Sequence, residues 1–190
     1  RAHPHVGLST VSYLFSGEIM HRDSLGYEQP IRPQEVNWMT AGSGITHSER
    51  FEHARAVGDR LHGIQAWVAL PEEFEETAPS FTHYAGTNLP HWNDGGVAGH
   101  LIAGSAYGLT AGAKTHSPLF YAHLEMEPGA VAEVPDKHEE RALYIAAGAI
   151  EMHGTRYEAG QMLVLGAGAS HFKAKTHSTV MVLGGEPIGD

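Results

Sequence analysis

Two short motifs with alternating ligand residues could bind a metal ion. The first, HPH, spans residues 3–5, and the second, HSE, spans residues 47–49. On a β-strand, residues i and i+2 point to the same side and lie about 6.5–7 Å apart. If both motifs lie on neighbouring strands, their side chains can converge on one point. The candidate ligands are His3, His5, His47 and Glu49. Three imidazoles and one carboxylate suit Fe(II), Mn(II), Ni(II), Cu(II) or Zn(II) and leave room for a substrate or dioxygen.

The composition narrows the ligands and partners that the chain can use. It has 190 residues, 15 histidines and no cysteine, which excludes disulfides, thiolate metal sites and cysteine nucleophiles. The formal net charge is −10 and the basic residues are scattered, so we expect no direct contact with nucleic acid, which needs clustered positive charge. No apolar run approaches the ~20 residues that span a bilayer. We therefore expect no membrane association and a cytoplasmic location.

The elements that must position these motifs are predicted to be short β-strands. TVSYLFSGEIM (10–20) predicts a strand, a bend at Gly17 and a second strand, and residues 36–51 predict two strands around a glycine-rich turn. Further short β-like runs follow from residue 97 onward, and we find no convincing helical stripe. The pattern predicts an all-β, barrel-like fold. We expect an N-terminal half over 1–80, a connector over 81–96 and a C-terminal half over 97–190.

The two halves of the chain repeat each other with an informative difference. We align Gly17 with Gly148 and, after shortening one turn by five residues, Gly42 with Gly168. In this alignment the residues equivalent to the four candidate ligands are Val134, Asp136, Lys173 and Lys175. This second set could not hold a divalent cation, so the candidate ligands are a property of the first half alone.

The longer sequence around these motifs resembles the pirin family of the cupin superfamily. The resemblance lies in HPHVGLSTVSYLFSGEIMHRDSLG (3–26) and VNWMTAGSGITHSERF (36–51), with further pirin-like stretches such as THYAGTNLPHW, LIAGSAYG and the final GGEPIG. It implies a bicupin, two tandem jelly-roll-like β-barrels, with one mononuclear metal in the N-terminal barrel and none in the C-terminal one. It also implies that the ligands are His3, His5, His47 and Glu49.

The chain departs from the wider pattern at two points. Cupins generally place a glutamate a few residues after the second histidine, whereas residues 7–10 here are Gly-Leu-Ser-Thr. Pirins also usually extend beyond both ends of this sequence, which begins at Arg1 rather than Met. We therefore expect a chain truncated at both ends, without the first strands of its N-terminal barrel.

Three functions are consistent with the resemblance. The first is a quercetin 2,3-dioxygenase-type enzyme that takes a flavonol-like aromatic substrate and O2, with Glu49 as the catalytic base. The second is a non-catalytic, iron- or redox-sensing regulator that binds protein partners, and the third is a structural bicupin. Fe(II) is the favoured ion, with Ni, Mn, Cu, Co and Zn as alternatives. His21 is interpreted as shaping a turn with Arg22 and Asp23, or alternatively as lying behind the ligands.

Overall fold

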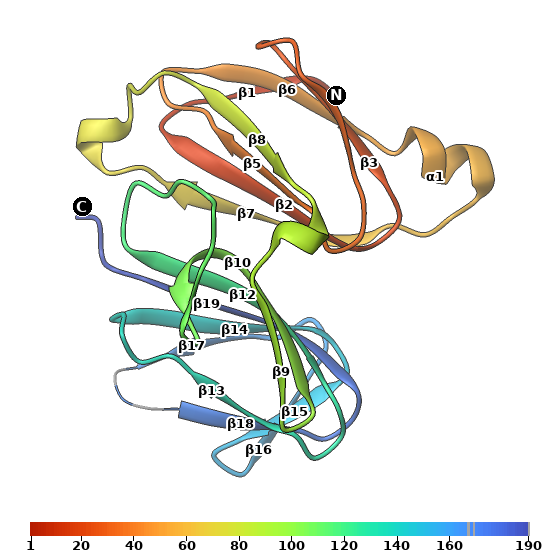
Figure 1. The fold of residues 1–190 in the computed structure, drawn as a ribbon, viewed down its shortest axis with the longest axis vertical. Coiled ribbons are helices and arrows are strands. Elements are labelled where there is room, and N and C mark those ends of the chain that lie inside the picture. Colours follow the sequence, from red (N-terminus) through yellow and green to blue (C-terminus); the bar gives the residue numbers. More distant parts are fainter. Residues whose placement is uncertain (167, 169, 190) are drawn as a thin grey trace. The chain divides into compact units, whose positions relative to one another are not determined.

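The structure, a computed structural model, describes residues 1–166, 168 and 170–189, with the backbone alone at residues 53 and 54. Strands dominate, and the α-helix among the described residues is the short α1 (Glu52–Val57). The all-β expectation is confirmed. The chain divides into two compact units, Arg1–Asn88 and Leu89–Asp190 (Figure 1). None of the described helices has the length and apolarity needed to cross a membrane.

The first unit consists of two antiparallel sheets of four strands each. One sheet has the order β1 (His3–His5), β6 (Ile45–Arg50), β3 (Ile19–Asp23) and β4 (Glu28–Ile31). The other has the order β7 (His62–Ala69), β2 (Leu8–Ser16), β5 (Val36–Thr40) and β8 (Ser80–Tyr84). Two 3₁₀ turns, η1 (Glu72–Phe74) and η2 (Gly86–Asn88), lie in the connections. Both predicted strand pairs, 10–20 and 36–51, are present.

Gly17 makes the predicted bend between β2 and β3. Its φ of +86° is in the left-handed region that glycine adopts readily. A Cβ at this position would lie 2.8 Å from the carbonyl oxygen of Arg60, closer than side chains approach. The bend therefore requires glycine for its backbone conformation and for its close packing.

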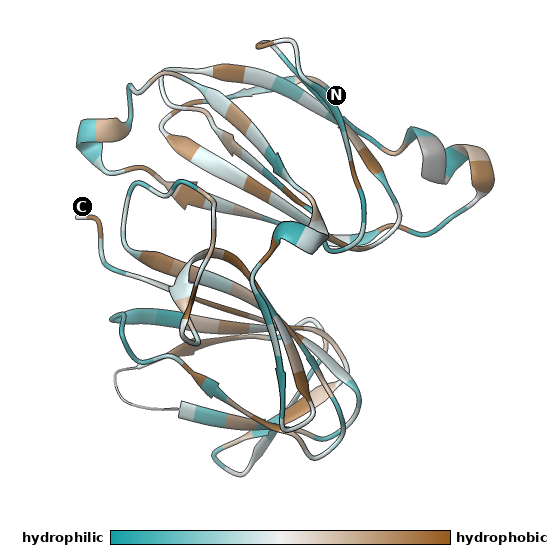
Figure 2. Ribbon diagram, viewed as in Figure 1, coloured by the Kyte–Doolittle hydropathy of each residue, from teal (hydrophilic) through white to brown (hydrophobic). Residues whose placement is uncertain are grey.

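The second unit repeats this two-sheet plan. Its larger sheet has the order β11 (Leu109–Thr110), β10 (Val97–Ala106), β12 (Leu119–Met126), β19 (Ser178–Gly185), β14 (Glu140–Ala147) and β17 (Met162–Leu165), with β9 (His91–Asp94) beside β10. The smaller sheet contains β13 (Val131–Val134), β18 (Ser170–Ala174), β15 (Ala149–Met152) and β16 (Thr155–Glu158). Apolar and polar residues alternate along many strands (Figure 2), as expected when one sheet face packs on a core.

The segment expected to connect the halves contributes a strand to each unit. β8 pairs with β5 in the first unit, and β9 pairs with β10 in the second. The division falls between Asn88 and Leu89. The prolines and turn residues of this segment concealed both strands. β8 gains its hydrogen bonds from a partner far away in the sequence, whereas β9 forms a hairpin with β10, which follows it directly.

The strand pairings confirm that Gly17 and Gly148 are equivalent. Gly148 has a φ of +79° and follows β14 as Gly17 follows β2. The β2–β7 pairing shifts register between Leu14 and Ser16, and the β14–β19 pairing shifts between Ile145 and Ala147. These two shifts lie the same number of residues before the glycine, so β2 corresponds to β14 and β7 to β19.

The same pairings correct the alignment of the second motif. His3 pairs with His47 in the first unit, whereas Val134, which aligns with His3, pairs with Ser170. The counterparts of His47 and Glu49 are therefore Ser170 and Phe172, and not Lys173 and Lys175. The turn in the second half is three residues shorter than the sequence alignment assumed, and turn length determines strand register.

Candidate metal centre

Three histidines of the first unit converge because β1 and β6 are neighbours. In this antiparallel pair His3 lies directly opposite His47, and His5 lies two residues further along β1 on the same side. His47 Nε2 is 3.1 Å from His5 Nε2 and 3.2 Å from His3 Nε2. His5 and His47 are buried, and His3 lies at the exposed edge of the cluster.

The hydrogen bonds of His3 show how the cluster could hold a cation. His3 Nδ1 lies 3.0 Å from the carbonyl oxygen of Arg1, and a carbonyl can only accept. In neutral His3 the free lone pair is therefore on Nε2, the atom that faces His47. A hydrogen bond to the second ring nitrogen fixes the tautomer and orientation of metal-binding histidines in the same way.

The spacing of the ring nitrogens fits a shared metal ion. With metal–nitrogen bonds of about 2.1 Å, two nitrogens at a right angle around the ion lie about 3.0 Å apart. The two Nε2–Nε2 distances of 3.1 and 3.2 Å agree with this value. His47 Nδ1 is buried without a hydrogen-bond partner. Hydrogen bonds between the rings therefore pair these ring nitrogens poorly. A cation at the centre of the cluster would bind the lone pairs of all three Nε2 atoms at once.

The cluster is electrostatically suited to cations because two of its histidines, His5 and His47, have a lowered pKa. Burial is the main cause that lowers the pKa of His47 to about 4, and the neighbouring rings of His21, His3 and His5 lower it further. Burial also lowers the pKa of His5, with His3 as the next cause. A histidine must be neutral to bind a metal, and His47 meets that condition at neutral pH.

Glu49 lies beside this triad with its carboxylate held by hydrogen bonds. Its Oε1 accepts a hydrogen bond of 2.7 Å from Ser12 Oγ, and its Oε2 accepts one of 2.8 Å from Gln65 Nε2. The ligand atoms of Glu49, His47 and His21 lie within 4.8 Å of one another. Three of the four predicted ligands therefore form one group, His3–His5–His47, whereas the fourth, Glu49, is grouped with His47 and with His21, which was not a predicted ligand.

His21 is closer to the candidate site than the sequence interpretation placed it. It is 2% exposed, and its ring stacks on Phe81 with centroids 4.3 Å apart. Its Nε2 lies 2.9 Å from Asp23 Oδ2. The signal in the sequence was the spacing His21-x-Asp23, which repeats the alternation of the two ligand motifs on a third strand.

Trp67 is a further neighbour that the sequence did not reveal. Its indole makes an edge contact with the His5 ring, with centroids 5.3 Å apart, and remains 65% exposed. It lies on β7 two residues after Gln65, so both side chains point to the same face of the strand. The open side of the cluster therefore has an aromatic surface.

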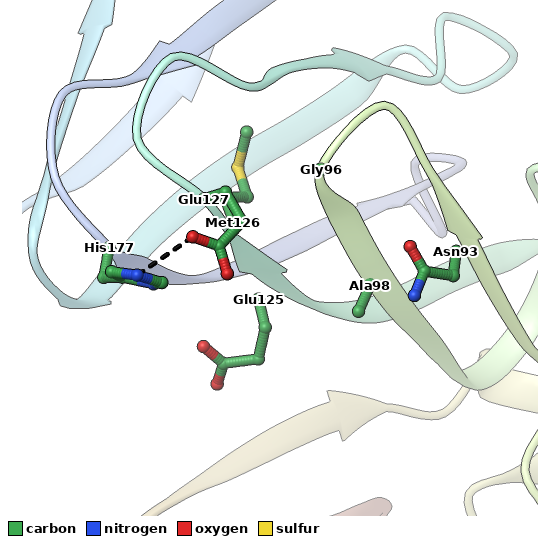
Figure 3. Close-up of a pocket in the computed structure, with 7 residues that line it drawn as sticks. All are labelled: Asn93, Gly96, Ala98, Glu125, Met126, Glu127 and His177. Carbon is green, nitrogen blue, oxygen red and sulfur yellow. Dashed lines mark ion pairs between the residues drawn. The ribbon is translucent and has the colours of Figure 1, made fainter.

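The second unit has a small hollow that is unlike a substrate site. It is lined by Asn93, Gly96, Ala98, Glu125, Met126, Glu127 and His177 (Figure 3). Its volume of about 140 Å³ is below the roughly 300 Å³ at which small-molecule sites begin. His177 and Glu127 pair with each other at 2.9 Å, which leaves them occupied.

Comparison with known proteins relates both units to one family. Residues 1–68 match the family described as Pirin, and residues 121–190 match the Pirin C-terminal cupin domain. A pirin-like protein of Caulobacter vibrioides is 57% identical over all of this chain, which covers 66% of that protein. A Pseudomonas aeruginosa protein provisionally named quercetin 2,3-dioxygenase is 37% identical over 98% of the chain, which covers 59% of it. The chain thus spans about three fifths to two thirds of these relatives.

The solved structures agree with this relationship. A quercetin 2,3-dioxygenase from Acinetobacter baumannii superposes with a TM-score of 0.91 at 28% identity, covering all of this chain and 68% of that one. The expected all-β organisation with two cupin domains is confirmed, although within the described ranges the strand pairings form separate sheets and no closed barrel. Sequence motifs, tandem two-sheet units and relatives all agree, and the chain belongs to the pirin family.

Proposed function

We propose that the chain carries the mononuclear metal centre of a quercetin 2,3-dioxygenase-type enzyme that cleaves flavonols with O2. The observation that carries this proposal is the convergence of the Nε2 atoms of His3, His5 and His47. Relatives that carry the name quercetin 2,3-dioxygenase support the choice of reaction. Fe(II) is our preferred ion, with Ni, Mn, Cu, Co or Zn as alternatives, because a site of nitrogen and oxygen ligands accepts all of them.

In this proposal the residues have two roles, binding of the metal ion and acceptance of a proton from the substrate. His3, His5 and His47 hold the ion, and Glu49, whose carboxylate is grouped with His47 and His21, completes the set. When bound, the ion supplies Lewis acidity and orientation to the flavonol oxygen and O2. Glu49 is the candidate acceptor for the flavonol hydroxyl proton, because it is the acidic side chain grouped with His47. The exposed indole of Trp67 offers a planar aromatic substrate a stacking surface.

The experiment that tests this proposal measures oxygen uptake. The purified protein is loaded anaerobically with Fe(II), supplied with quercetin and then exposed to oxygen, with metal content assayed in parallel. We expect uptake in proportion to metal occupancy, and neither metal nor uptake in His47→Ala. His153→Ala, a change at an exposed histidine, is the matched control and should keep both.

Metal-loaded protein that consumes no oxygen with quercetin would overturn the flavonol assignment. A protein that takes up no metal at pH 7 would overturn the metal centre itself. The two failures are separate because occupancy and oxygen uptake are measured on the same sample.

A further inference from the structure

We propose that Ser12 and Gln65 are positioning residues that fix the orientation of the Glu49 carboxylate at the candidate metal centre. The inference rests on the proposed function, in which Glu49 belongs to the ligand set. It adds two residues that neither the ligand motifs nor their spacing indicated, one on β2 and one on β7.

The three side chains form a closed triangle of hydrogen bonds. Ser12 Oγ lies 2.7 Å from Glu49 Oε1, and Gln65 Nε2 lies 2.8 Å from Glu49 Oε2. The third side joins Gln65 Nε2 to Ser12 Oγ at 2.9 Å. Each carboxylate oxygen therefore has its own donor, and the two donors are bonded to each other.

The donor and acceptor properties of the three side chains determine which atom receives each hydrogen of this triangle. A carboxylate only accepts, so the single Ser12 hydrogen must go to Glu49 Oε1. Ser12 Oγ is then an acceptor for Gln65, whose NH2 group has two hydrogens, one for Ser12 and one for Glu49. The reverse orientation of the Gln65 amide would place its oxygen against two acceptors, so the network selects one orientation.

The backbone holds the two donors in register. Ser12 and Gln65 are directly paired across β2 and β7, whereas Glu49 comes from β6 in the other sheet of the same unit. Ser12 is only 4% exposed. The triangle thus joins the two sheets of the first unit and fixes both the rotamer and the plane of the carboxylate. A ligand that is already oriented loses less conformational freedom when it binds a metal.

The second unit shows that the fold itself does not require this polar triangle. Leu143 corresponds to Ser12 by the Gly17–Gly148 equivalence, and its partner across β14 and β19 is Val182. Phe172 corresponds to Glu49 by the pairing of β13 with β18. All three belong to the hydrophobic core of the second unit and are at most 1% exposed. The same positions are apolar where the histidine cluster is absent, which ties the polar set to the candidate metal centre.

The test measures metal affinity in variants of the whole protein, with Ni(II) as an air-stable probe and a competing chelator. We expect Ser12→Ala and Gln65→Leu each to weaken binding about 10- to 100-fold, the usual effect of removing a residue that orients a ligand. The double variant should lose little more than the stronger single variant, because the residues act as a unit. Ser12→Thr, which retains the hydroxyl, should keep an affinity close to that of the wild type.

Ser9→Ala is the matched control. Ser9 lies on the same strand, is fully buried and shares a 3.0 Å hydrogen bond with Thr40 that does not reach Glu49. It should lose stability as Ser12→Ala does but keep the wild-type affinity. The visible spectrum of bound Co(II) gives a second readout, which we expect to change in Ser12→Ala and Gln65→Leu only.

The outcomes separate this inference from the proposed function. Wild-type affinity in both Ser12→Ala and Gln65→Leu would overturn the positioning role and leave the metal centre intact. Equal losses in Ser12→Thr and Ser12→Ala, or in Ser9→Ala, would show that packing rather than the hydroxyl matters and would also overturn it. If the wild-type protein binds no Ni(II), the metal centre fails and the positioning role fails with it.

Discussion

His47 should make the metal-free protein less stable in mild acid, and His47→Gln should remove that effect. Burial lowers the pKa of His47 to about 4 in the folded protein, against about 6.5 in an unfolded chain. The unfolded state therefore binds a proton as pH falls through 6.5, while the folded state does not until about pH 4. The contribution of neutral His47 to the free energy of unfolding is therefore fully present above pH 6.5. It is lost as the pH falls from 6.5 toward 4.

The size of the effect follows from these two pKa values. At pH 5 the unfolded histidine is about 97% protonated and the folded one about 10%, which corresponds to a loss of about 2 kcal/mol relative to pH 7. His47 itself is 2% exposed, but His3 beside it lies at the exposed edge of the cluster. Solvent there screens part of the interaction, so we expect a loss of about 1 kcal/mol.

The assay is urea unfolding with chelator present, at pH 7 and pH 5. Trp92 lies in the second unit, so a Trp92→Phe background limits the fluorescence signal to Trp38 and Trp67 of the first unit. Glutamine is neutral at both values, so His47→Gln should lose about 1 kcal/mol less than the wild type between pH 7 and pH 5. Ser9→Ala, a buried change that does not titrate, should follow the wild-type pH dependence.

Equal pH dependence in the wild type and in His47→Gln would refute the reasoning. It would mean that the folded His47 accepts a proton as readily as the unfolded one. The cluster would then not be kept neutral by burial, and its readiness for a cation at neutral pH would lose its physical basis.

Three further predictions concern metal binding and the turns. Metal at 100 times its dissociation constant should raise the free energy of unfolding by about 2.7 kcal/mol, and EDTA should reverse this in thermal melts; an unchanged melt would contradict binding to the folded state. Because Trp67 contacts His5, paramagnetic Ni(II) should quench its fluorescence in titrations, and Trp67→Phe should abolish most of the quenching; undiminished quenching would place the ion elsewhere. Gly42→Ala should cost more than about 3 kcal/mol, and Gly26→Ala about 1–2 kcal/mol, by urea unfolding. Both glycines have a positive φ, so the backbone strain is shared. A Cβ added at Gly42 would lie 2.0 Å from the carbonyl oxygen of Thr77, whereas a Cβ added at Gly26 would have no neighbouring atom within 4 Å. Similar losses of stability in the two variants would contradict the role of the Thr77 contact.

The candidate site also qualifies the role of Glu49 as a proton acceptor. Both of its oxygens accept hydrogen bonds from Ser12 and Gln65. A carboxylate held on both oxygens is well suited to a fixed ligand position, and any proton must go to its remaining lone pairs. The Ni(II) affinities and the oxygen uptake of the same variants will show whether the binding and proton roles of Glu49 change together.

The periodicity of the sequence was sufficient to predict the local structure of this protein, that is, the side-chain directions along single strands and one bend. The i, i+2 spacing of His3 with His5, and of His47 with Glu49, depends only on the pleat of a strand. The bend at Gly17 depends on the backbone freedom of one residue. The sequence also indicated that the second half lacks the ligands, and this conclusion survives the corrected register, in which Ser170 and Phe172 replace Lys173 and Lys175 as the counterparts.

Only the tertiary structure decided which residues face one another. Strand register depends on turn lengths and on packing between segments distant in sequence, and a shift of a few residues changes every neighbour. The observed register places His47 between the histidine rings of β1 and His21 of β3, and it places Gln65 opposite Ser12. The histidine cluster can be anticipated from two short motifs. The hydrogen-bonded support of Glu49 cannot, because its three members are brought together from separate strands by the pairing of sheets rather than by any local pattern.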